Sequence, residues 1–160
     1  MPDRSQILEL LRTNPERIAE LTAGLTPAQL QTRPEPAEWS AAELLAHLRS
    51  CATLWGEYMA TIAATDGTTF RVVNPAAWIE QTDYPRQKYG PAWRAYREQR
   101  AQLLTMLAEL PEAAWAHTAT ITGAGAPLRK TVLDYAKRLA THERAHLRQF
   151  RKITESARAA

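Results

Sequence analysis

Two histidines in the C-terminal part of the chain, His142 and His146, lie four residues apart within a helical pattern and constrain the fold more than any other feature. Side chains at positions i and i+4 share one face of a helix, about one turn apart. The same face carries four apolar or aromatic side chains, Tyr135, Leu139, Phe150 and Ile153. Polar groups that face a core need a partner. We therefore expect both imidazoles to point inward and to share a ligand such as a metal ion.

The spacing of apolar residues predicts four amphipathic helices of about 20 residues each, over residues 4–23, 40–64, 91–110 and 130–154. Residues 65–90 and 111–128 are long connections, and the second contains a turn or short hairpin over residues 121–127. This pattern predicts an all-α fold, a four-helix bundle with two long connections. We expect a single domain over residues 1–154 and a frayed tail over residues 155–160.

Local signals refine these helices. Ser40 followed by Glu43 matches the capping box that starts a helix. Pro15 predicts a break or kink near Asn14 in the first helix. Proline at the first helical position also predicts a short helix that begins at Pro27.

Composition excludes several classes of protein. The net charge of +3 is spread along the chain without a basic block, so a nucleic-acid partner is unsupported. No segment reaches the roughly 18–20 consecutive apolar residues of a membrane span, and we expect no signal peptide. The single cysteine, Cys51, excludes an internal disulfide and suits a reducing compartment. We therefore expect a cytoplasmic protein.

Two histidines hold a metal ion poorly, and His47 is the best candidate for a third ligand. It lies at the margin of the apolar stripe of its predicted helix and can face the last helix in a bundle. His117 lacks such a periodic context, and Cys51 either adds a thiolate or fills the core. Three imidazoles with an open position are typical of a catalytic zinc or nickel site. The alternative is that hydrogen bonds satisfy three histidines in or near the core.

Residues 142–146 also spell His-Glu-x-x-His, the zinc-protease signature in which the glutamate is the general base. Such enzymes need a further ligand downstream. The sequence after His146 has no histidine, and its one acid, Glu155, lies in the predicted tail. The chain also shows no strand pattern that would align a peptide substrate. The sequence therefore disfavours a protease.

The motifs WSAAELLAHL and HERAHLRQ resemble the DinB/YfiT superfamily of metal-dependent helical-bundle proteins. The matching residues are Trp39, Ser40, His47, His142, His146, Leu147 and Gln149. The resemblance covers nearly the whole chain. It implies a DinB-like four-helix bundle, a zinc or nickel ion on the three histidines, and frequent homodimers. Characterised relatives include thiol S-transferases and mycothiol-dependent isomerases, so the resemblance also implies a small-molecule substrate and a low-molecular-weight thiol.

Five further residues are candidates for roles at such a site. Glu143 either acts as a general base or pairs with an arginine at the surface. Glu43 is placed to orient a liganding imidazole, in competition with its capping role. Arg100 occupies an apolar-stripe position, where it pairs with a glutamate or binds a substrate carboxylate. Tyr58 could line the substrate pocket and Trp78 could cover it, and the alternative for both is aromatic packing in the core.

Three functions are consistent with these patterns. The first is a metal-dependent enzyme that uses a thiol cofactor, either a transferase or a related hydrolase-like enzyme, since a divalent cation lowers the pKa of a bound thiol or water. The second is a non-catalytic metal-binding or stress-related bundle. The third is a structural helical dimer without a metal. We expect the first. Metal content separates the third from the others, and activity with thiols separates the first from the second.

Overall fold

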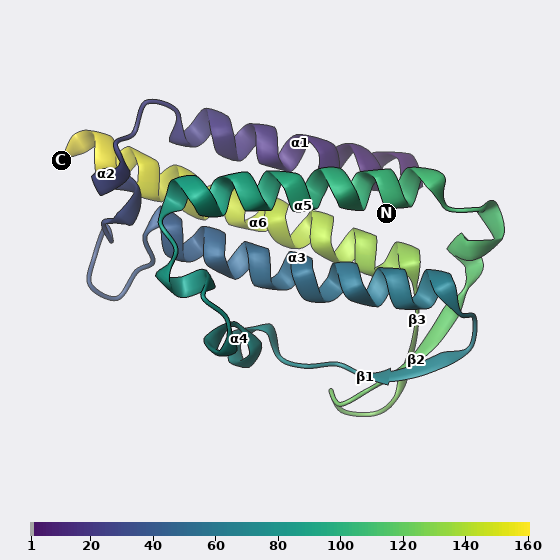
Figure 1. The fold of residues 1–160 in the computed structure, drawn as a ribbon. Coiled ribbons are helices and arrows are strands. Elements are labelled where there is room, and N and C mark those ends of the chain that lie inside the picture. The colour runs from purple at the N-terminus through teal and green to yellow at the C-terminus, as the bar shows by residue number, and fades with distance from the viewer. Residues whose placement is uncertain (1) are drawn as a thin grey trace.

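Four long helices lie side by side and form the body of the molecule (Figure 1). A computed structural model describes residues 2–160. Within this range the long helices are α1 (Arg4–Thr22), α3 (Ala41–Ala64), α5 (Tyr89–Glu109) and α6 (Val132–Ala159). The predicted four-helix bundle is confirmed. Among the described residues, no helix combines the length and the apolar character that crossing a bilayer requires.

The starts of the helices follow local sequence signals. Capping boxes begin α1, the short helix α2 (Pro27–Gln31), α3 and α6, and each box joins a side chain and a backbone N–H in both directions. The predicted box at Ser40 and Glu43 is present, as is the short helix at Pro27. In α6 the box joins Thr131 and Asp134. These caps fix where the two histidine-bearing helices, α3 and α6, begin.

Helix α1 does not break at Pro15; of the break or kink predicted near Asn14, the break is absent and the helix is continuous from Arg4 to Thr22. Proline has no N–H to donate to the carbonyl of Leu11, one turn earlier. Nη1 of Arg100 in α5 donates to that carbonyl instead, at 2.8 Å. The buried side chain of Asn14 donates to the Ala140 carbonyl of α6, at 3.1 Å. Arg100 thus replaces the hydrogen bond that proline removes, and Asn14 ties the same part of α1 to α6.

Helix α6 continues to Ala159, where the sequence predicted a frayed tail over residues 155–160. The side chain of Gln29 in α2 donates to the Ala157 carbonyl at 3.1 Å. Arg158 donates to the carbonyl of Leu21 in α1 at 2.8 Å. These contacts come from the opposite end of the chain, and they order the last turns of α6.

A three-stranded sheet lies beside the C-terminal end of α3 and the N-terminal end of α6 (Figure 1). Its central strand β2 (Thr118–Thr122) pairs in parallel with β1 (Thr68–Arg71) and antiparallel with β3 (Leu128–Thr131). The β2–β3 pair is the hairpin suggested by the glycine-containing segment, and Gly123 adopts the positive φ of 95° that favours glycine. Strand β1 was not predicted. Ile121 of β2 is buried in the core, so the sheet packs on the bundle.

Short helical elements fill the two long connections. Three of them pack along α3 between β1 and α5, namely α4 (Pro75–Trp78), η1 (Ile79–Gln81) and η2 (Tyr84–Arg86). A further 3-10 helix, η3 (Glu112–Ala116), precedes β2. The connections are therefore ordered against the bundle.

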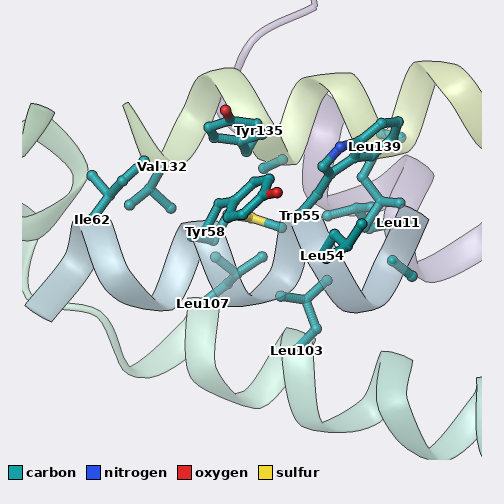
Figure 2. Packing of buried hydrophobic residues seen from close by; sticks show 14 of the residues in the cluster. Leu11, Leu54, Trp55, Tyr58, Ile62, Leu103, Leu107, Val132, Tyr135 and Leu139 are labelled. Carbon is teal, nitrogen blue, oxygen red and sulfur yellow. The ribbon is translucent and has the colours of Figure 1, made fainter. Parts of the chain in front are cut away.

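The core consists of two groups of buried side chains, one on each side of the histidine-bearing turns. The larger group includes Tyr58 of α3 and Leu139 of α6 (Figure 2). The smaller group includes Leu44 of α3 and Phe150 of α6. Burial of these apolar side chains is the main favourable contribution to folding. Along both helices the three histidines fall at the boundary between the two groups.

A buried ion pair between Arg100 of α5 and Glu143 of α6 joins the helices in the interior. The side chains are only 4% and 0% exposed, and Nη1 of Arg100 lies 3.0 Å from Oε2 of Glu143. The Tyr96 hydroxyl donates to Oε1 of the same carboxylate at 3.1 Å. Burial lowers the pKa of Arg100, but the adjacent Glu143 carboxylate outweighs this effect and raises it overall. The charges are tolerated in the core because each is paired and hydrogen-bonded.

Removal of one partner of this pair should destabilise the protein strongly. Arg100→Met leaves the Glu143 charge and the Leu11 carbonyl without their partner, and we expect the free energy of unfolding to fall by about 3–5 kcal/mol. Urea denaturation measures the change. The double variant Arg100→Met/Glu143→Leu removes both charges and should regain part of the loss. A double variant that is no more stable than Arg100→Met would contradict this account of the pair.

Candidate metal centre

The side chains of His47, His142 and His146 meet between α3 and α6. Nε2 of His142 lies 3.1 Å from Nε2 of His47 and 3.2 Å from Nε2 of His146. One ligand nitrogen of each ring lies within 4.8 Å of the other two, and all three residues are partly buried. The structure thus brings together the three histidines singled out in the sequence, although the first two are 95 residues apart.

The direction of the two helices makes this meeting possible. Tyr58 packs on Tyr135 while His47 meets His142, so α3 and α6 run antiparallel. The early turns of α3 therefore face the middle turns of α6. Helix α6 presents His142 and His146 one turn apart on the face that looks toward α3.

The nitrogen spacing fits a single divalent cation. Metal–nitrogen bonds of 2.0–2.1 Å at tetrahedral angles place two ligand nitrogens about 3.3 Å apart, close to the 3.1 and 3.2 Å of the histidine cluster. Hydrogen bonds alone satisfy the rings less well. A neutral imidazole has one N–H, so Nε2 of His142 can donate to only one of its two neighbours. The donor set therefore fits a metal ion with nitrogen ligands, such as zinc or nickel.

A glutamine on α6 orients one of the rings. Nδ1 of His146 lies 2.9 Å from Oε1 of Gln149. An amide oxygen is only an acceptor, so Nδ1 carries the proton and the Nε2 lone pair faces the other two histidines. Such a partner fixes the tautomer of a liganding histidine. Sequence reasoning gave Gln149 no role beyond the family pattern, although its i+3 spacing from His146 was a usable signal.

The electrostatic environment keeps two of the rings neutral. Burial lowers the pKa of His142 to about 4, and the charges of His146, His47 and Arg138 act in the same direction. Burial, followed by the charge of His146, also lowers the pKa of His47. Both imidazoles are therefore uncharged near pH 7, and the uncharged form is the one that binds a metal ion. Nδ1 of His142 is buried without a hydrogen-bond partner in the described chain.

Two tryptophans flank the histidine cluster along α3. The ring of Trp39, just before the helix, lies 5.2 Å from the ring of His47. The ring of Trp55 lies 5.1 Å from the ring of His142 in an edge-on arrangement. The guanidinium of Arg138 in α6 covers the face of Trp55, 4.8 Å from the ring centre. The cluster therefore lies in a partly apolar setting.

Glu143 and Arg100, for which the sequence left open a site role or an ion pair, lie together in the buried ion pair. Neighbouring residues on a helix point about 100° apart, so Glu143 faces α5 although it directly follows His142. Its carboxylate already accepts hydrogen bonds from Arg100 and Tyr96. This environment favours the ion pair as the role of both residues. The sequence placed the pairing of Glu143 at the surface, whereas the pair lies in the core.

Glu43 serves the start of α3. Its carboxylate is bound by Nε of Arg33 at 3.0 Å and by the Ser40 amide at 2.8 Å. The hydrogen bond from Arg33 is the main reason why the pKa of Glu43 is lowered. Within residues 2–160 no hydrogen bond joins Glu43 to His47, so its geometry favours the capping role over orientation of the ring.

The remaining candidates lie outside the cluster of three histidines. Tyr58 accepts a hydrogen bond from the Val73 amide at 3.0 Å and lines a pocket between α3, α6 and the sheet. Trp78 lies in α4 and packs edge-on against Tyr84, with ring centres 5.8 Å apart. His117 lies outside the cluster, with Nδ1 3.0 Å from the Ala63 carbonyl.

The sequence matches a known protein family, and the fold matches solved structures. A sequence model of the DinB superfamily matches residues 10–150, and no protein with a curated description matches. YfiT from Bacillus subtilis, described as a probable metal-dependent hydrolase with an unusual four-helix bundle topology, aligns with a TM-score of 0.77 at 13% identity, over 97% of this chain and 89% of that chain. A mycothiol-dependent maleylpyruvate isomerase aligns with a TM-score of 0.71 at 15% identity, over 91% of this chain and 60% of that chain. These likenesses show a shared fold, and the chain spans about 60% of the length of the isomerase.

Cys51, considered in the sequence as an additional ligand, should be unreactive in the folded protein. It lies in the larger core group, outside the cluster of three histidines, and burial raises the pKa of its thiol to about 11. At pH 8 only about one thiol in 1,000 is then ionised. We expect a disulfide reagent such as DTNB to label the native protein far more slowly than the urea-unfolded protein. Equal labelling rates would contradict the buried position.

Proposed function

The chain belongs to the DinB superfamily, and we propose that it is a metal-dependent enzyme that acts on a small molecule at His47, His142 and His146. The observation that carries the proposal is the convergence of three imidazoles at a spacing that suits one zinc or nickel ion. Three protein ligands leave a position for substrate, which is the composition of a catalytic site and not of a closed structural one.

Within this class we propose a transferase that uses a low-molecular-weight thiol, or a related hydrolase-like enzyme. When bound, a divalent cation lowers the pKa of a coordinated thiol or water and so supplies a nucleophile near neutral pH. The residues of the chain would have three roles: the three histidines would hold the ion, Gln149 would orient one ring, and Trp39 and Trp55 would form an apolar border. The mycothiol dependence of a protein with the same fold supports the thiol.

The environment of Glu143 does not suit this residue to the role of general base. A water molecule that attacks a substrate generally needs a base to accept its proton. The carboxylate nearest to the histidines in the sequence is fully buried and bound to Arg100. Either nucleophile, thiol or water, would therefore rely on the metal ion for its ionisation and not on Glu143. A cytoplasmic location and association into homodimers complete the proposal.

Metal content is the first test. Elemental analysis of untagged protein should find about one zinc or nickel ion per chain, and His142→Ala/His146→Ala should lose it. The matched control is His117→Ala, which removes a histidine outside the cluster and should keep the ion. Wild-type protein that stays metal-free after incubation with both metals would overturn the proposal and leave a structural bundle.

Turnover separates an enzyme from a metal-binding protein without activity. The metal-loaded protein is assayed with a panel of low-molecular-weight thiols and a chromogenic electrophile. We expect thiol-dependent product formation that is lost in His142→Ala/His146→Ala and kept in His117→Ala. A full complement of metal without turnover for any thiol would favour the non-catalytic alternative.

Gln149 should control metal affinity without binding the metal. Gln149→Leu keeps the size of the side chain but removes the acceptor at Nδ1 of His146. We expect affinity for zinc to fall by about 10–100-fold, the usual effect of losing such a partner, as measured by competition with a chelating dye. Gln149→Glu retains an acceptor and should restore most of the affinity. If Gln149→Leu binds zinc as tightly as the wild type, the hydrogen bond has no role in ligation.

A further inference from the structure

A pocket of about 410 Å³ lies between α3, α6 and the sheet. Trp55 and Tyr58 of α3 and Tyr135 of α6 form its aromatic side, and Figure 2 shows these three rings between the two helices. Lys130 of β3 and Arg138 of α6 add two positive charges to the lining. A volume of this size suits a small organic molecule.

The pocket adjoins the histidine cluster. The ring of Trp55 separates the two, because it lines the pocket and also contacts the ring of His142. Arg138 lies one turn before His142 on α6, with its guanidinium over the ring of Trp55. The pocket and the histidine cluster therefore share Trp55 as a common wall and lie next to each other along α6.

The charge of the pocket is not compensated by the protein. No acidic residue lines it, and the ion pairs among residues 2–160 involve neither Lys130 nor Arg138. Asp134, which lies between these two residues in the sequence, is bound to Thr131 in the cap of α6. Contact with Trp55 holds the guanidinium of Arg138 over the ring face. Two unpaired cations beside an aromatic surface are suited to an anion carried on an apolar body.

We propose that this pocket binds the anionic part of the molecule that reacts at the histidines, an organic carboxylate or phosphate. The proposal rests on the proposed function for the reaction, whereas the binding itself needs only the pocket. The apolar body packs on Trp55, Tyr58 and Tyr135, and the anionic group is bound by Lys130 and Arg138. Recognition of a substrate anion, which the sequence suggested for Arg100, thus falls to two other cations.

Binding of simple probes tests the inference. Calorimetry compares 3-phenylpropionate and phenyl phosphate with the uncharged 3-phenylpropionamide on wild-type protein and on Lys130→Met/Arg138→Met. We expect the wild type to bind at least one anion about tenfold more tightly than the amide, and the double variant to lose this preference. Tighter binding of 3-phenylpropionate would identify the anionic group as a carboxylate, and tighter binding of phenyl phosphate would identify it as a phosphate. The single variant Lys130→Glu, on a half-buried strand position, should also abolish the preference.

A matched control is Arg129→Met/Arg144→Met, which removes one charge from β3 and one from α6 outside the pocket and should keep the preference. The same titrations on His142→Ala/His146→Ala separate the two proposals. Retained preference there supports the pocket whether or not the protein binds metal. Equal affinity for anions and amide in the wild type overturns the inference. So does a preference that survives Lys130→Met/Arg138→Met but disappears with the histidines, because the anion would then bind at the metal centre itself.

Discussion

The buried pair of Arg100 and Glu143 is the interaction on which the rest of the structure depends. It joins α5 to α6 directly and reaches α1 through the Leu11 carbonyl, which Pro15 leaves without its usual donor. Glu143 directly follows His142, so the position of its carboxylate fixes the rotation of α6 about its own axis. The inward direction of the two α6 histidines is therefore set by a charge held on a different face of the same helix.

The functional features lie in a line along the contact between α3 and α6. The histidine cluster comes first, then Trp55 with Arg138 over its face, and then the pocket closed by the sheet. The three histidines and the pocket aromatics thus come from two rigid helices, which hold side chains more accurately than loops do. The sheet contributes Lys130, and the connection after β1 contributes Val73, whose amide donates to the Tyr58 hydroxyl.

Periodicity along single helices was sufficient to predict the bundle and the residues that meet at the centre. The i, i+4 pair on an apolar stripe indicated His142 and His146, and the stripe of the second predicted helix indicated His47. What the sequence did not reveal were partners distant in the chain. The match of Arg100 with Glu143, the continuity of α1 through Pro15, the ordered end of α6 and strand β1 all depend on contacts between separate elements. Patterns within one segment carry no record of such contacts, which is why the sequence could not decide between a site role and an ion pair for Arg100 and Glu143.

The 95 residues that separate His47 from His142 determine how much a bound ion would stabilise the fold. An ion bound by both histidines would close more than half of the chain into one loop, as a disulfide does in other proteins. This chain has a single cysteine and cannot form such a bond within itself. For a loop of this length, the chain-entropy treatment of crosslinks gives about 4–5 kcal/mol. Unlike a disulfide, this crosslink would open and close with the supply of metal and not with the redox state. The folded state would then be more stable where metal is plentiful and less stable where metal is scarce.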